Sequence, residues 1–407
     1  MLTTLRDYIG SQHHAMVNLL HEWCTINSGS TNLSGLKEML DKLHQAFTPL
    51  ADTIEICASP PIHTIGLDGN AHVESCGDFL FIRKRPELKR RILLCAHMDT
   101  VFSETHPFQY LKKIDANTLN GPGVTDMKGG IIVLLHALAA FEQLSEAETL
   151  GWDILINSDE ELGSPSSRIF LDQIAPQYQV GLVYEPAMTT EGAFAKNRRG
   201  SGKLTIVASG KAAHAGRDFD SGRNAIVKLA KILVDIHALN QKRKSVTINI
   251  GKICGGEALN IVPERAVAKL DVRISRDTDE MWVRHQIDKV IHRHQEEGYH
   301  VECIGQFHRP LKRVNRATKQ LFKRIQLIGK TINLNLQWKD SGGCCDGNNL
   351  SAHGLAVIDT LGVRGGLIHS EHEFILLDSL VERTLLNTLL YLELAKGGLE
   401  EISTHRG

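Results

Sequence analysis

Apolar residues recur at helical spacing near the beginning of the chain. This spacing predicts a helix over residues 5–24, and residues 32–47 predict a second one. Further along, four short apolar segments are each followed by polar side chains: Ile92–Ala96, Ile154–Ile156, Val180–Tyr184 and Leu355–Ile358. Such segments, separated by helical stretches such as 130–144, are typical of buried parallel strands. The pattern predicts an α/β fold with a mostly parallel sheet flanked by helices.

A different pattern occupies residues 200–306. Segments with an alternating or strand-like texture are 204–208, 246–250, 266–274 and 300–304. Segments that predict helices are 225–236 and 280–297. The order strand, helix, strand, strand, helix, strand is that of a ferredoxin-like α+β module. We therefore expect an inserted domain at 200–306 that interrupts a catalytic α/β domain made of residues 1–199 and 307–407.

Composition narrows the class of protein. The chain has 407 residues, of which 42% are hydrophobic, an ordinary value for a globular protein with a large core. Its 46 basic and 47 acidic residues leave a net charge of -1, which argues against nucleic acid or an anionic membrane as a partner. The longest nearly apolar segment, 131–141, is too short to span a bilayer. Because no signal peptide is evident, we expect a cytoplasmic protein.

Polar clusters follow the predicted strands at their carboxyl ends, where the sites of open α/β sheets assemble. The candidates in these clusters and in a glycine-rich loop are His97, Asp99, Asp126, Glu160, Glu161, Glu185 and His369. His97 and Asp99 are two residues apart on an extended segment, so their side chains leave on one face. Each candidate alone has an ordinary explanation, such as a core histidine, a turn aspartate or an exposed helix start. Only their convergence indicates a site.

The same clusters and their flanking motifs resemble one family. The matching strings are "CAHMDTV", "GPGVTDMKGG", "SDEELGS", "YEP", "SGKAAHAG", "GGEALNIVPERA", "LDVR", "SGG" with "DGN", and "GGLIHSEHE". The chain resembles the di-zinc metallopeptidase and deacylase family of glutamate carboxypeptidase, acetylornithine deacetylase, succinyl-diaminopimelate desuccinylase and aminoacylase. The bacterial glutamate carboxypeptidase branch is the most similar. The resemblance implies a zinc-exopeptidase type of α/β domain with an inserted lid and dimerisation domain.

The resemblance also implies a centre of two divalent metal ions. His97 and Glu185 would bind one ion, Glu161 and His369 the other, and Asp126 would bridge both. Zinc accepts this mixture of nitrogen and oxygen ligands, and cobalt or manganese are the other candidates. Three carboxylates and a shared hydroxide would balance the charge of two dications.

Further roles follow from the same resemblance. Glu160 would act as the general base that takes a proton from the metal-bound water and so leaves the bridging hydroxide, and Asp99 would orient His97. His214 would stabilise the oxyanion, and Asn260 and Arg273 would hold a free carboxylate of the substrate. From the residues alone, Arg273 can equally form an exposed ion pair with its neighbour Asp271, and His214 can be a surface histidine.

These roles predict a carboxypeptidase that cleaves the amide bond of a small peptide or N-acyl amino acid. An N-acyl amino acid deacylase is the alternative within the family, and an inactive binding scaffold on the same fold is the alternative from another class. We expect a homodimer, because the inserted domain of this family commonly pairs two chains. Cys344 and Cys345 depart from the family pattern, which has a small or hydroxyl residue there, and suggest a hypothesis of oxidation sensitivity.

Overall fold

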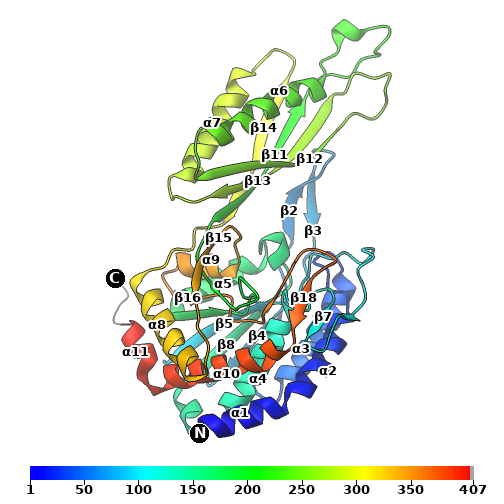
Figure 1. Ribbon diagram of the computed structural model, residues 1–407. Helices are drawn as coiled ribbons and strands as arrows, with labels where there is room; N and C mark the ends of the chain where they lie inside the picture. The colour runs from blue at the N-terminus through cyan, green and yellow to red at the C-terminus, as the bar shows by residue number, and fades with distance from the viewer. Residues whose placement is uncertain (404–407) are drawn as a thin grey trace. The chain divides into compact units, whose positions relative to one another are not determined.

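The computed structural model describes residues 1–403 and divides into two compact units, and Figure 1 labels most of their helices and strands. The first unit comprises 1–60, 75–198 and the chain from Lys312 onward, and the second comprises 61–74 and 199–311. The sequence predicts that 61–74 belongs to the catalytic domain. The structure instead pairs β2 (Ile62–Ile65) with β3 (Ala71–Glu74) in a hairpin of the second unit. Arg265 secures the hairpin by donating to Asn70 Oδ1 over 2.7 Å.

The first unit is built on a mixed sheet. Its strands, in spatial order, are β1 (Thr53–Cys57), β4 (Phe79–Lys84), β8 (Gly151–Asn157), β5 (Arg91–His97), β9 (Val180–Val183) and β16 (Ala356–Ile358). β8, β5, β9 and β16 run parallel, whereas β4 pairs antiparallel with both β8 and the edge strand β1, so β4 alone runs in the opposite direction. The predicted α/β fold with a flanked sheet is thus confirmed, and its parallel part carries the polar clusters.

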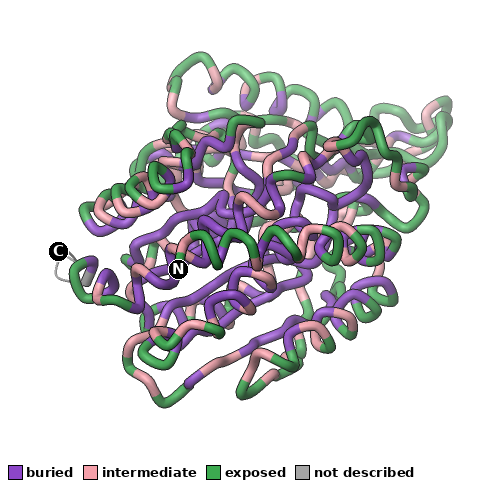
Figure 2. The backbone as a smooth tube through the Cα atoms, turned by 60° about the horizontal axis from the view of Figure 1, so that its bottom comes forward, coloured by how far each residue is buried: buried purple, intermediate pink, exposed green. Residues whose placement is uncertain are grey.

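Helices cover both faces of this sheet. The helices of the first unit are α1 (Leu2–Ser11), α2 (His13–Cys24), α3 (Leu33–Phe47), α4 (Lys128–Phe141), α5 (Ser167–Ile174), α8 (Arg316–Thr331), α9 (Asp346–Ala352), α10 (Asp378–Glu393) and α11 (Leu399–Ser403). Leu94 and Ile154 point into the core formed with α4 and α10, while Leu93 and Leu155 point to α5 and α9. Figure 2 shows exposed residues gathered on the outward turns of the helices. The alternation along each strand therefore builds a three-layer unit.

Two smaller sheets complete the first unit. One joins β6 (Lys112–Lys113), β7 (Thr118–Asn120), β17 (Gly365–Gly366) and β18 (Phe374–Leu376). The other pairs β10 (Phe194–Arg198) with β15 (Trp338–Ser341). The first of these matters for the site, because Phe374 pairs with Asn120 across β18 and β7. It brings the chain after His369 beside the chain before Asp126.

The second unit has the predicted element order. Its sheet has the spatial order β12 (Val246–Gly255), β13 (Arg265–Ile274), β11 (Gly200–Ser209) and β14 (His300–Arg309), all antiparallel. Helices α6 (Ala225–Ala238) and α7 (Asp279–Arg293) share one apolar core with this sheet. α7 ends at Arg293, earlier than the predicted 297, and Gly298 adopts a left-handed φ of 81° in the following turn.

The predicted helix over 5–24 is two helices in the structure. They meet at Gln12, whose N–H donates to Ile9 O over 3.1 Å in a tighter turn. Both halves keep their apolar positions in the core, so periodicity alone does not reveal the break. Among the residues that the structure describes, no helix combines the length and the apolar character needed to cross a bilayer.

The central strand β8 provides a test of the first unit's core. Ile154→Ala removes a fully buried side chain and is expected to lower the free energy of unfolding by about 2–5 kcal/mol, because the cavity does not close completely. Ile56→Ala, at a residue 52% exposed on β1 of the same unit, is the matched control and is expected to cost under about 0.5 kcal/mol. Urea denaturation followed by circular dichroism measures both. Equal losses for the two variants would contradict the assignment of the core.

Candidate active site

The carboxyl ends of neighbouring parallel strands bring four candidate residues to one place. His97 is the last residue of β5, and Glu185 lies two residues beyond β9. Glu160 and Glu161 begin a short 3-10 helix, η2 (Glu160–Leu162), directly after β8. Because β8, β5 and β9 are adjacent and parallel, their following residues meet at one edge of the sheet.

Asp126 lies between two imidazole rings. Its Oδ1 is 3.2 Å from His97 Nε2, and its Oδ2 is 3.2 Å from His369 Nε2. Asp126 comes from the loop before α4, and His369 from the loop between β17 and β18. One carboxylate thus presents a different oxygen to each histidine, which is the arrangement of a bridging metal ligand.

Each histidine also faces a second carboxylate. His97 Nε2 lies 3.7 Å from Glu185 Oε1, and His369 Nε2 lies 3.3 Å from Glu161 Oε2. The site therefore consists of two half-sites, each with one imidazole, one terminal carboxylate and one oxygen of Asp126. We call them the His97 half-site and the His369 half-site. The His97 side chain is 1% exposed and that of His369 is 50% exposed, so the second half-site is open to solvent.

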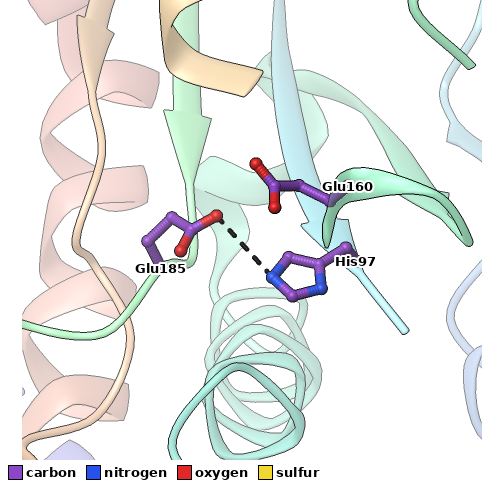
Figure 3. Close-up of side chains that lie close together, drawn as sticks. All are labelled: His97, Glu160 and Glu185. Carbon is purple, nitrogen blue, oxygen red and sulfur yellow. Dashed lines mark ion pairs between the residues drawn. The ribbon is translucent and has the colours of Figure 1, made fainter. Parts of the chain in front are cut away.

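Glu160 extends toward the His97 half-site from η2. Ligand-type atoms of Glu160, His97 and Glu185 all lie within 4.8 Å of one another. Figure 3 shows the Glu160 carboxylate above the His97 ring, with Glu185 approaching from the neighbouring strand end. A carboxylate in this place is close enough to exchange a proton with a molecule bound between the half-sites.

Asp99 connects the two elements that carry these side chains. His97 Nδ1, the ring nitrogen that faces away from Asp126, hydrogen-bonds to the Asp99 carbonyl oxygen over 3.0 Å, and Asp99 Oδ1 lies 3.3 Å from the same nitrogen. The Asp99 carboxylate also accepts the N–H of Glu160 over 3.2 Å, the N–H of Glu161 over 3.1 Å and the Ser30 hydroxyl over 2.7 Å. Asp99 therefore fixes both the His97 ring and the start of η2.

The charges of the site call for cations. Burial and the charge of Asp126 raise the pKa of Glu185 to about 8 and also raise that of Glu161. Hydrogen bonds to Asp126 and Glu161 raise the pKa of His369 to about 11. Glu185 Oε1 is buried and has no hydrogen-bond partner. Two oxygen-rich half-sites, each with an imidazole and an acidic excess, fit divalent metal ions.

The residues predicted to bind substrate lie in the second unit and do not all come together. His214 and Asn260 are neighbours, since Ala215 N donates to Asn260 O over 2.9 Å and His214 pairs with Ile261. Both are exposed. The turn that carries Asn260 leads into β13 at Arg265. Arg273 lies near the other end of β13, about 26 Å along the strand from Arg265. One chain therefore cannot offer Arg273 and Asn260 to the same small carboxylate.

Arg273 does form the alternative ion pair with Asp271. Its Nε donates to Asp271 Oδ1 over 2.7 Å, and Lys203 on the neighbouring strand also contacts Asp271. The Arg273 side chain is 30% exposed. The guanidinium is thus held in place by its partner while part of it stays accessible.

Sequence analysis missed Glu373, which closes the "GGLIHSEHE" motif. It is buried in the loop that carries His369, and its carboxylate accepts the N–H groups of Gly123, Thr125 and Asp126. Burial and the nearby Asp126 charge raise its pKa to about 7. The motif does place an acidic residue four positions after the candidate ligand His369. The motif alone, however, does not show which groups the Glu373 side chain contacts.

The two adjacent cysteines differ in environment. Cys345 is buried at the N-terminus of α9, and its Sγ contacts Asp359 Oδ2 over 3.6 Å. Burial raises the pKa of the Cys345 thiol well above its usual range, which disfavours the reactive thiolate. Cys344 is half-buried. The hypothesis of oxidation sensitivity therefore loses its support at Cys345.

Comparisons with known proteins identify peptidases as similar to this chain. A family model described as a peptidase dimerisation domain matches residues 197–298, and a model of peptidase family M28 matches residues 81–223. Carboxypeptidase G2 of a Pseudomonas species is 26% identical over 310 residues, which cover 76% of this chain and 75% of that protein. A probable carboxypeptidase of Arthroderma gypseum is 31% identical, over 45% of this chain and 43% of the fungal protein.

Solved structures show the same fold. Human carnosine dipeptidase 1 has a TM-score of 0.72 at 16% identity, covering 97% of this chain and 99% of that one. A family M20 metallo-carboxypeptidase of Sulfolobus solfataricus has a TM-score of 0.71 at 16% identity, covering 93% and 99%. The two peptidase models together match residues 81–298, and the chain is similar in sequence to carboxypeptidase G2 over three quarters of its length. These similarities support metal-dependent peptide hydrolysis over the inactive-scaffold alternative.

The contacts of Asp99 predict the effect of its loss. Asp99→Asn keeps the shape of the side chain but removes the charge that faces His97 Nδ1 and the N–H groups of Glu160 and Glu161. We expect the affinity for Zn²⁺ to fall by about 10- to 100-fold. Equilibrium dialysis with metal analysis measures this, and Ser30→Ala, which removes one hydroxyl bond to Asp99, serves as the milder control. Undiminished metal affinity in Asp99→Asn would exclude the orienting role.

Proposed function

We propose that this protein is a carboxypeptidase that uses two divalent metal ions, most simply zinc. Its substrates would be small peptides or N-acyl amino acids that carry a free carboxylate. The observation that carries the proposal is Asp126, whose two oxygens each face a different histidine at 3.2 Å. A structural salt bridge would not need this symmetry, whereas a pair of adjacent cations does.

The ligands follow from the two half-sites. His97 and Glu185 would hold one ion, His369 and Glu161 the other, and Asp126 would contact both. Bound ions would supply Lewis acidity, which polarises the scissile carbonyl and lowers the pKa of an attacking water. The exposed ring of His369 leaves this side of the centre accessible to a substrate.

Proton transfer is assigned to Glu160. Its carboxylate lies beside the His97 half-site and η2 fixes its backbone, while Asp99 holds the Glu160 N–H. Glu160 would accept a proton from the attacking water and pass it to the nitrogen of the leaving amine. One carboxylate can do both, because the amide nitrogen becomes basic only after the tetrahedral centre forms.

Recognition of the substrate carboxylate is assigned to Arg273. Its planar guanidinium suits a bidentate contact, and its ion pair with Asp271 pre-orients it. The names of the related proteins, carboxypeptidase G2 and the fungal probable carboxypeptidases, favour release of a C-terminal amino acid over deacylation. Deacylation of an N-acyl amino acid remains the second candidate, since it requires the same carboxylate.

A homodimer is part of the proposal. The match of residues 197–298 to a peptidase dimerisation domain supports it. The separation of Arg273 from His214 and Asn260 along β13 supports it independently, because a small substrate can meet both groups only if two copies contribute. His214 and Asn260 of a second copy would then act on the substrate carbonyl and its surroundings.

The proton-transfer role of Glu160 predicts a separation of binding from turnover. Glu160→Gln is expected to lower kcat by about 10²- to 10⁴-fold on a metal-reconstituted enzyme, while the metal content stays unchanged. Steady-state assays on a panel of dipeptides, folate-like glutamyl amides and N-acetyl or N-succinyl amino acids measure this and identify the preferred class. Retained turnover in Glu160→Gln would refute the assigned base.

The role of Arg273 predicts selective loss on carboxylate substrates. Arg273→Ala is expected to lower kcat/KM about 10- to 100-fold for a free C-terminal carboxylate, because a charge-assisted hydrogen bond is lost. The same peptide with a C-terminal amide should be a poor substrate of both the wild type and Arg273→Ala. Lys203→Ala, which removes the other cationic partner of Asp271, is the control. A similar loss in both variants would assign Arg273 a structural role only.

A further inference from the structure

We propose that Glu373 is a positioning residue that sets Asp126 against His369 and thereby shapes the His369 half-site. Glu373 is 1% exposed and lies four residues after His369 in the same loop. Its carboxylate reaches across to the loop that carries Asp126. The inference rests on the proposed function, because it assumes that the half-sites bind metal.

The contacts of Glu373 use both carboxylate oxygens. Oε1 accepts the N–H of Asp126 over 3.0 Å and the N–H of Thr125 over 2.9 Å. Oε2 accepts the N–H of Gly123 over 3.1 Å. Three converging N–H donors require an acceptor at each position, and a carboxylate offers acceptors only. A glutamine would turn an NH₂ group toward at least one of these donors.

Neutral hydrogen bonds hold the same two loops together around Glu373. The Thr125 hydroxyl donates to Phe374 O over 2.6 Å, and Asn120 Nδ2 donates to Glu373 O over 2.7 Å. Gly121 N donates to Glu373 O over 3.2 Å. These bonds align the strands β7 and β18, but the Glu373 carboxylate is the group that contacts the backbone of Asp126 itself.

The loop that carries His369 needs such an anchor. Leu367 and His369 both adopt left-handed φ values, 54° and 61°, which are unfavourable for residues with a Cβ. The His369 ring is also half-exposed, so packing restrains it less than it restrains His97. Contacts with other parts of the chain must therefore hold this backbone in place. Glu373 provides such a contact, because its carboxylate binds the N–H of Asp126, the residue that His369 faces.

Loss of the carboxylate should act unequally on the two half-sites. Asp126 belongs to both, but only the His369 half-site takes two of its ligands from the loops that Glu373 joins. The other two ligands of the His97 half-site are His97, at the end of β5, and Glu185, just after β9. Neither is on a loop that Glu373 joins. Glu373→Gln should therefore weaken one of two metal-binding steps.

Titration of the metal-free protein with Co²⁺, followed by visible absorbance and by metal analysis after dialysis, tests this. In the wild type we expect two equivalents to bind. In Glu373→Gln we expect one equivalent at nearly wild-type affinity and the other weakened by about 10- to 100-fold. Glu371→Gln, which makes the same chemical change at an exposed residue of the same loop, should titrate like the wild type.

The outcomes separate the two proposals. A wild type that binds no metal refutes the proposed function, whereas two equal equivalents in both wild type and Glu373→Gln refute the role of Glu373 alone. Equal weakening of both steps would assign Glu373 a general structural role and overturn the inference. If Glu373→Gln does not fold, Glu373→Asp keeps the charge but shortens the side chain, so that its carboxylate no longer reaches all three N–H groups. It should weaken the same step several-fold, and an unchanged titration would overturn the inference.

Discussion

The repulsion among three buried carboxylates is the constraint on which the first unit depends. Asp126, Glu161 and Glu185 converge within a few ångströms of two imidazoles, and these carboxylates are nearly buried although the His369 ring is 50% exposed. Burial and the charge of Asp126 raise the pKa values of both glutamates, so the two imidazoles compensate the negative charge of these carboxylates only in part. Divalent cations would neutralise the negative charge of these carboxylates, and this attraction would provide the affinity of the site for metal ions.

In this fold, rigid strands support the site, and the candidate ligands lie at the strand ends and in the loops that follow them. Further carboxylates then restrain the loops through backbone N–H groups: Asp99 holds the start of η2, and Glu373 holds the chain at Asp126. The half-site with a buried histidine is fixed by strands, and the half-site with an exposed histidine is fixed by loop-to-loop bonds. The accessible side is thus the side that needs additional anchoring.

In the proposed function, the second unit would contribute substrate recognition rather than metal binding. Its antiparallel sheet places Arg273 at one end of β13, and the turn that bears Asn260 at the other. The two ends of one long strand cannot contact the same small molecule. The positions of Arg273 and Asn260 are therefore consistent with the proposed homodimer, in which a substrate would contact residues of two copies. The dimerisation-domain match covers this same unit.

The sequence by itself determined the elements and the candidate ligands. Periodicity located most helices and strands, because alternation and helical spacing are local properties, and the motifs identified His97, Asp126 and their partners by resemblance. Only the tertiary structure decided strand direction at β4, the assignment of 61–74 to the second unit, and the contacts of Glu373. These depend on packing between segments far apart in the chain: Glu373 lies 247 positions from the N–H of Asp126 that it accepts. No local pattern encodes such a pairing.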